Sequence, residues 1–283
     1  MTEKRDGNKI TVPDLREMKE NSEKISMITA YDYPTALLVD RAGIEVILVG
    51  DSVGNTVLGY PNTIPVTVEE ILHHTKAVMR GVNDALVIAD MPFMSFNIST
   101  EQAVENAGQF MKEGGADAVK LEGGRGVAGT VKALARAGIP VMGHIGLTPQ
   151  RVSELGGFKV QGRDLKRAQE LLDDALILEQ AGAFSIVLEL VPYQLAQIIT
   201  DKAKIPTIGI GAGPFCDGQV LVIHDILGLS FRFSPKFVKQ YVNLADEIET
   251  ALTTFKREIK AGEFPSVETH SFSMSEEVLQ RLQ

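Results

Sequence analysis

Ala-Val-Lys-Leu-Glu-Gly-Gly, residues 118–124, reads as a short apolar strand that ends in two glycines. Alternate side chains of a strand share a face, so Lys120 and Glu122 point the same way and Leu121 points to the opposite side. A cation and a carboxylate near the end of a buried strand cost free energy unless they are paired or used. The stretch therefore indicates a functional site at a strand end.

Three other apolar runs of the chain end in the same way. They are residues 46–49 before Asp51, residues 85–89 before Asp90, and residues 185–188 before Glu189. One acid at a strand end means little on its own. Four acids at equivalent places indicate a single site on which the strands converge.

The order of the apolar runs predicts the fold. We expect eight strands, at residues 25–29, 45–49, 85–89, 118–122, 139–143, 185–188, 207–210 and 219–223. Helical segments alternate with these strands, which is typical of parallel sheets buried on both faces. A doubly wound open sheet is the rival arrangement. The count of eight and the length of 283 residues favour a (β/α)8 TIM barrel.

Some segments lie outside the repeating unit. A capped helix at residues 15–21 predicts an N-terminal helical extension, and a last helix at residues 236–260 precedes a polar C-terminal tail. Residues 53–65 and 145–163 are long insertions, and the first could act as a lid. We expect residues 1–283 to form one catalytic barrel domain.

Composition excludes several classes of function. The net charge is −9 and there is no basic block, so nucleic acid is not an expected partner. No apolar run could span a bilayer and residues 1–8 contain no signal-peptide core, so we expect a cytoplasmic protein without a membrane partner. Cys216 is the only cysteine, which rules out an intramolecular disulfide and a multi-cysteine metal site.

Three of the strand-end acids are candidate metal ligands. Asp51, Asp90 and Glu122 follow consecutive predicted strands, whose ends are neighbours in a barrel. Carboxylate oxygens suit Mg²⁺, which keeps waters and leaves positions for a substrate. The alternative is that each acid caps a helix or binds backbone amides, but three together favour a metal.

Lys120 has three possible roles. It could form a Schiff base with a carbonyl substrate, it could hold a substrate oxygen as a fixed cation, or it could be a structural ion-pair partner of Glu122. A metal would already polarise the carbonyl. The neighbouring carboxylates therefore favour the fixed cation over the Schiff base.

Glu189 is the candidate general base or acid, because the sixth strand faces strands two to four across a barrel. The alternative is a buried acid hydrogen-bonded to a loop. His144, which follows the fifth predicted strand, is interpreted as a supporting residue. Tyr31 and Tyr33, in Thr-Ala-Tyr-Asp-Tyr at residues 29–33, receive no role.

Eight motifs together resemble one family, the ketopantoate hydroxymethyltransferases, from about residue 9 to about residue 272. The motifs are TAYDY (29–33), LVGDSVG (48–54), ADMPFM (89–94), VKLEGG (119–124), GHIGLTPQ (143–150), GGFKVQGR (156–163), LELVP (188–192) and GIGAG (209–213). Two segments depart from the family's usual patterns, GYPNT at residues 59–63 and FRFSPKF at residues 231–237. These departures concern loop contacts and leave the strand-end site intact.

The resemblance implies a barrel, Mg²⁺ dependence and a homodecamer. It also implies transfer of a one-carbon unit from 5,10-methylenetetrahydrofolate to 3-methyl-2-oxobutanoate, giving 2-dehydropantoate in pantothenate biosynthesis. By matching positions, Asp51, Asp90 and Glu122 would surround the metal. Asp51, Ser52, Asp90 and Lys120 would hold the oxo acid, and Glu189 would be the proton acceptor.

Three other functions stay open. A metal-dependent lyase or mutase of the phosphoenolpyruvate mutase and isocitrate lyase type would use the same logic, but it usually carries a Lys-(Lys/Arg)-Cys-Gly-His loop, which this sequence lacks. A Schiff-base aldolase would use Lys120. A non-catalytic ligand-binding barrel would tolerate loss of the strand-end acids, and this chain retains all four.

Overall fold

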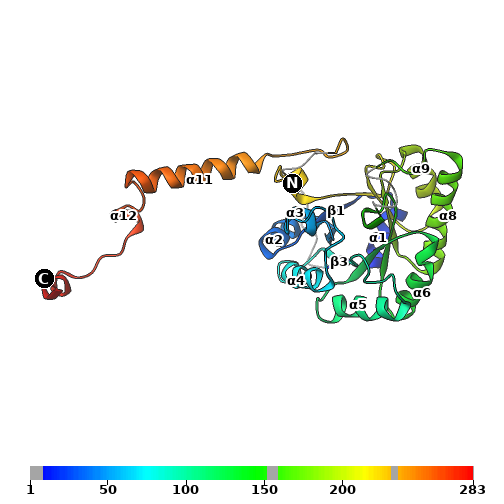
Figure 1. The fold of residues 1–283 in the computed structure, drawn as a ribbon, viewed down its shortest axis with the longest axis horizontal. Helices are drawn as coiled ribbons and strands as arrows, with labels where there is room; N and C mark the ends of the chain where they lie inside the picture. Colours follow the sequence, from blue (N-terminus) through cyan, green and yellow to red (C-terminus); the bar gives the residue numbers. More distant parts are fainter. Residues whose placement is uncertain (1–8, 152–158, 231–234, 283) are drawn as a thin grey trace.

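The fold is a closed barrel of eight parallel strands in sequence order, seen here in a computed structural model that describes residues 9–151, 159–230 and 235–282 (Figure 1). The strands are β1 (Ile25–Thr29), β2 (Val46–Val49), β3 (Leu86–Asp90), β4 (Ala118–Glu122), β5 (Val141–Gly146), β6 (Ser185–Glu189), β7 (Thr207–Ile210) and β8 (Gly218–Leu221). The pairing of β8 with β1 closes the ring. The predicted barrel is confirmed, and the open doubly wound sheet is wrong.

Alternation along the strands creates two apolar cores. Val46 and Leu48 of β2 pack inside the barrel, whereas Ile47 and Val49 pack outward against the helices. The covering helices are α2 (Tyr33–Arg41), α4 (Val68–Met79), α5 (Thr100–Lys112), α6 (Ala128–Arg136), α8 (Leu165–Ala181) and α9 (Tyr193–Lys202). Because most strands carry apolar residues on both faces, the barrel is buried from both sides.

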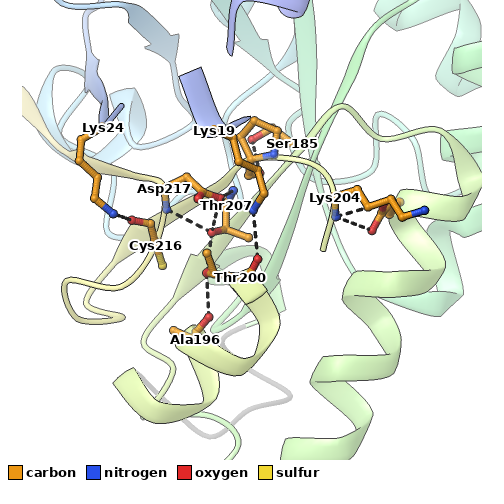
Figure 2. Close-up of polar contacts among 11 residues, drawn as sticks. Lys19, Lys24, Ser185, Ala196, Thr200, Lys204, Thr207, Cys216 and Asp217 are labelled. Carbon is orange, nitrogen blue, oxygen red and sulfur yellow. Dashed lines mark hydrogen bonds and ion pairs between the residues drawn. The ribbon is translucent and has the colours of Figure 1, made fainter. Parts of the chain in front are cut away.

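The N-terminal helix α1 (Val12–Glu20) covers the end of the barrel where the strands begin. Its Leu15 and Met18 belong to the interior core. Next to them, Lys19 Nζ lies 2.7 Å from Asp217 Oδ2 and donates to the Thr200 carbonyl at 3.0 Å (Figure 2). Since α1 occupies this end, the opposite end, where the strands finish, is left for the site.

Several predicted boundaries were wrong, including the start of α1, which is Val12 and not residue 15. The last long helix, α11 (Leu244–Ala261), begins eight residues after the expected Lys236. The preceding segment instead runs beside α10 (Ile223–Ile226), where Tyr241 N donates to the Ile226 carbonyl at 2.8 Å. Strand β5 extends to Gly146, so it includes His144, and β8 ends at Leu221 because α10 starts at Ile223.

The C-terminal part leaves the barrel. Helix α11, followed by α12 (Val267–His270) and α13 (Glu276–Leu282), projects away from the barrel wall (Figure 1). The first insertion begins with a short helix, α3 (Val53–Thr56). Within the described ranges, no helix is long and apolar enough to cross a membrane.

Candidate active site

Lys120 and Asp90 form a buried ion pair at the ends of β3 and β4. The parallel register places the two residues opposite each other, and Lys120 Nζ lies 2.9 Å from Asp90 Oδ1. Burial opposes the positive charge of Lys120, but the carboxylates of Asp90, Glu122 and Asp51 outweigh it and raise the pKa of the lysine. Lys120 is therefore a cation at this site, and its ion-pair partner is on the neighbouring strand.

Asp51 contacts Asp90 through its backbone and Gln150 through its side chain. Its backbone N–H donates to Asp90 Oδ2 at 3.0 Å, and its own Oδ2 accepts from Gln150 Nε2 at 2.9 Å. Burial and the negative charges of Asp90 and Glu122 raise the pKa of Asp51 well above its usual range. A positive charge bound beside Asp51 would offset this repulsion.

Glu122, His144 and Glu189 form a row across β4, β5 and β6. His144 Nδ1 lies 3.5 Å from Glu122 Oε1, and His144 Nε2 lies 3.1 Å from Glu189 Oε2. Burial and Lys120 disfavour the imidazolium, but the hydrogen bonds and charges of the two glutamates prevail and raise the pKa of His144 to about 9. His144 is thus a single cation that lies between the two carboxylates and holds both in place.

Exposure distinguishes the two glutamates of this row. The side chain of Glu122 is 2% exposed, whereas that of Glu189 is 14% exposed. Glu122 also accepts from the backbone N–H of Gln150 at 3.1 Å. Glu189 is therefore the carboxylate of the row that an incoming molecule can reach.

Gln150 connects the two halves of the site and received no role from the sequence. Its side chain donates to Asp51 and to the Met91 carbonyl, while its backbone donates to Glu122. Its Oε1 is buried and finds no hydrogen-bond partner among the described residues. The residue ends the motif at residues 143–150, but nothing in that motif predicts that a loop glutamine reaches the end of β2.

Ser52 lies one residue beyond Asp51, at the start of α3. Its Oγ is 2.8 Å from the hydroxyl of Tyr31. Ser52 is half-buried, and its neighbour Asp51 belongs to the acidic cluster. The structure thus brings together all the site residues that the sequence predicted: Asp51, Ser52, Asp90, Lys120, Glu122 and Glu189.

The donor set fits a divalent cation. In the part of the chain that the structure describes, the cations beside these four acids, Asp51, Asp90, Glu122 and Glu189, are Lys120 and His144, so negative charge is in excess. Among the described residues, no three acid, histidine or cysteine side chains converge as a complete ligand group. Mg²⁺ does not need one, because it usually takes one or two carboxylates and completes its octahedron with water and substrate.

A closed parallel barrel with acids, a lysine and a histidine at the carboxyl ends of its strands is the architecture of a TIM-barrel enzyme with an acid–base site. The family model described as ketopantoate hydroxymethyltransferase matches residues 9–267. The chain belongs to the ketopantoate hydroxymethyltransferase family and is an enzyme.

Curated relatives carry the same name over nearly their whole lengths. The chain is 60% identical over 275 residues to 3-methyl-2-oxobutanoate hydroxymethyltransferase of Carboxydothermus hydrogenoformans, covering 97% of this chain and 99% of that protein. It is 58% identical over 266 residues to the enzyme of that name from Syntrophus aciditrophicus, covering 94% and 97%.

Solved structures of lower identity share the fold. Phosphonopyruvate hydrolase in complex with oxalate and Mg²⁺ superposes with a TM-score of 0.60 at 15% identity, covering 96% of this chain and 95% of that one. 2,3-Dimethylmalate lyase, a member of the phosphoenolpyruvate mutase/isocitrate lyase superfamily, gives 0.56 at 15% identity, covering 96% and 94%. These likenesses concern the barrel alone.

The structure describes the first of the two divergent loops in full and the second only in part. In residues 59–63, the Tyr60 hydroxyl donates to Glu70 Oε1 on α4 at 2.6 Å, so this loop is held against a covering helix. Residues 231–234 of the second loop, like residues 156–158 of a family motif, lie outside the described residues. Phe237 packs against Gly211, after β7.

Proposed function

We propose that this enzyme transfers a hydroxymethyl group from 5,10-methylenetetrahydrofolate to 3-methyl-2-oxobutanoate, forming 2-dehydropantoate in pantothenate biosynthesis. Family membership with 60% identity to a named relative supports the substrate pair. The observation that carries the proposal is that a buried cation, Lys120, and an accessible carboxylate, Glu189, lie at the same end of the barrel. We place all of residues 1–283 in a single catalytic unit working in the cytoplasm.

Binding of the oxo acid would use Asp51, Ser52, Asp90 and Lys120. The Lys120 ammonium supplies a fixed positive charge for an oxygen of the substrate, and the Ser52 hydroxyl supplies a neutral donor. Buried charges of this kind act strongly because little water competes with them. The cluster therefore suits a small anion with a carbonyl beside its carboxylate.

Asp51, Asp90 and Glu122 would hold Mg²⁺, directly or through water. When bound, the cation supplies Lewis acidity at the carbonyl oxygen, which makes the neighbouring C3–H bond more acidic. Gln150 keeps Asp51 oriented from the side, and Lys120 does the same for Asp90. Such supporting contacts matter for metal affinity in known sites.

Glu189 would remove the C3 proton. The electron pair of that C–H bond then becomes the enolate, whose oxygen faces Lys120, and C3 forms the new bond to the one-carbon unit. In the balanced reaction both C–N bonds from that carbon to the folate break, one water supplies the hydroxyl group, and tetrahydrofolate leaves. His144 keeps the Glu189 carboxylate in place through the 3.1 Å contact.

Two alternative reactions receive less support. A Schiff base needs a neutral amine, but the carboxylates around Lys120 raise its pKa and hold it as an ammonium. A lyase or mutase reaction is suggested only by structures of 13–16% identity, which share the fold. Borohydride would trap a Schiff base, and the absence of trapping alongside sensitivity to a chelator would exclude that aldolase.

We also propose a homo-oligomer, which the family resemblance implies is a decamer. Helix α11 has no buried residue, and four of its large apolar side chains lie about one turn apart: Ile248, Leu252, Phe255 and Ile259. Monomeric proteins rarely expose such a continuous stripe. A second copy of the chain is the partner that would cover it.

The decisive experiment is formation of 2-dehydropantoate from the two substrates. We expect turnover by the purified protein, loss of turnover in EDTA, and recovery when Mg²⁺ is restored. Turnover that survives complete removal of divalent metal would contradict the proposed role of the cation. No product under any condition would reject the reaction itself.

A further inference from the structure

Tyr31 is a fully buried polar residue that the proposed chemistry does not yet use. It lies between β1 and α2, with 1% of its surface exposed. Its ring packs beside the ring of His224, and its backbone carbonyl accepts from His74 Nδ1 at 2.6 Å. The phenol is therefore held in place from several sides, and its hydroxyl has a defined target.

That target is Ser52. The Tyr31 hydroxyl oxygen lies 2.8 Å from Ser52 Oγ. Ser52 is itself held at its backbone, because Thr56 Oγ1 donates to its carbonyl at 2.9 Å. The contact thus joins a rigid buried phenol to a half-buried serine beside the acidic cluster.

Chemistry decides which hydroxyl donates. A phenol is far more acidic than an alkyl hydroxyl, so it is the better donor and the poorer acceptor. Burial raises the pKa of Tyr31 to about 12, which keeps its proton in place. Ser52 Oγ therefore accepts from Tyr31, and the proton of Ser52 remains available.

We propose that Tyr31 is a positioning residue that fixes the Ser52 hydroxyl with its proton directed at the bound 2-oxo acid. The inference rests on the proposed function, in which Ser52 binds that substrate. Without the phenolic donor, the serine hydroxyl would rotate and donate elsewhere. Tyr31 itself does not touch the substrate in this arrangement.

The test is a double-mutant cycle with Tyr31→Phe and Ser52→Ala. Calorimetry measures binding of 3-methyl-2-oxobutanoate in the presence of Mg²⁺, without folate, and turnover gives KM and kcat. Loss of one oriented neutral hydrogen bond predicts a roughly three- to tenfold weaker affinity for Tyr31→Phe. We expect KM to rise by a similar factor while kcat stays nearly unchanged, because the contact is made throughout the reaction.

The double variant separates positioning from structure. If Tyr31 acts only through Ser52, the double variant should bind no more weakly than Ser52→Ala alone. Additive losses, wild-type affinity in Tyr31→Phe, or wild-type affinity in Ser52→Ala would each overturn the inference. Tyr31→Phe keeps the buried ring, and thermal unfolding of each variant checks that the fold is retained.

Tyr33→Phe is the matched control. It removes the same hydroxyl from the same motif, but Tyr33 is 47% exposed on α2, so wild-type binding is expected. Failure of the wild-type protein to form 2-dehydropantoate would reject the proposed function. Wild-type turnover combined with an unaltered Tyr31→Phe variant would reject only the role of Tyr31.

Discussion

At the scale of single residues, the site consists of like charges held close together by a few cations and amides. Asp51 and Asp90 both have raised pKa values, chiefly because they are buried. The pKa of Glu122 is instead lowered, because the hydrogen bond and charge of His144 and the charge of Lys120 outweigh its burial. Carboxylates with different surroundings can take different tasks within one site.

The Glu189→Gln variant tests whether Glu189 is the carboxylate that removes the C3 proton. Glutamine keeps the shape of the side chain but cannot accept the C3 proton. We expect exchange of that proton with solvent to slow by at least about a hundredfold, the usual contribution of a general base. Deuterium exchange followed by NMR measures it, and calorimetry should show that the oxo acid still binds.

The control for this variant is Glu113→Gln, which alters an exposed acid paired with Lys76. It should exchange at the wild-type rate. Wild-type exchange in Glu189→Gln would remove Glu189 from the role of proton acceptor.

Gln150→Ala tests the link between the two halves of the site. The variant removes the amide donor from Asp51 but keeps the backbone bond to Glu122. We expect Mg²⁺ affinity to fall about tenfold or more, as for other residues that orient a metal ligand. Titration calorimetry with Mg²⁺ measures this directly, and Gln169→Ala, on the exposed face of α8, is the control. Unchanged Mg²⁺ affinity would show that Gln150 does not support the cation.

At the scale of elements, helix α1 completes the barrel. It seals the end opposite the site with Leu15 and Met18, and a polar cluster attaches it to β7 and β8. Asp217 Oδ2 accepts from Lys19, from the Thr207 backbone N–H at 2.9 Å and from the Thr207 hydroxyl at 3.1 Å (Figure 2). One carboxylate oxygen thus collects donors from an N-terminal helix and from a strand almost two hundred residues away in the chain.

Lys19→Met should therefore destabilise the fold. The variant keeps the apolar stem but removes the donor for Asp217 and for the Thr200 carbonyl. We expect a loss of about 1–3 kcal/mol in the free energy of unfolding, because partly buried acceptors lose their partner. Urea unfolding followed by circular dichroism measures it.

Arg16→Met, on the same helix, is the matched control. Arg16 pairs with Glu20 on the surface, where both side chains are 64% exposed. Its loss should change the free energy by less than about 1 kcal/mol. Equal effects of the two substitutions would mean that the Lys19 cluster contributes no more than a surface pair.

At the scale of the whole molecule, the barrel is complete but α11 is not covered. The helix projects from the barrel wall (Figure 1), and a surface groove of about 780 Å³ runs beside it, lined by residues of α11 and of the segment before it. The apolar stripe and the groove lie on one exposed element. Their exposure in the single chain is the physical reason to expect association between copies.

Leu252→Asp should disrupt that association. Leu252 is 62% exposed in the middle of the stripe, so an aspartate there is harmless to a monomer but would be buried in an interface. We expect the variant to have a lower mass in sedimentation equilibrium than the wild type. Thr250→Asp places the same charge on the opposite face of α11 and should keep the wild-type mass. Equal masses for Leu252→Asp and wild type would exclude this face as the contact.

Local patterns predicted most of the fold because they act within a few residues. Apolar runs such as residues 46–49 favour strands, and the acids that follow them then lie at one end of a parallel barrel. Helix α11 shows the limit of this reasoning. Its start at Leu244 depends on backbone bonds between residues 241–244 and α10, which no local pattern contains.

The sequence by itself determined the barrel, the end that carries the site, and the acids and lysine that reach it, because strand periodicity and order leave few other placements. Only the tertiary structure decided the partners: Lys120 with Asp90, His144 between Glu122 and Glu189, Gln150 beside Asp51, and Tyr31 on Ser52. These contacts depend on distances across the barrel, between residues far apart in the chain. Hydrogen bonds and charge effects change within an ångström or two, so the pairing follows from the closed geometry.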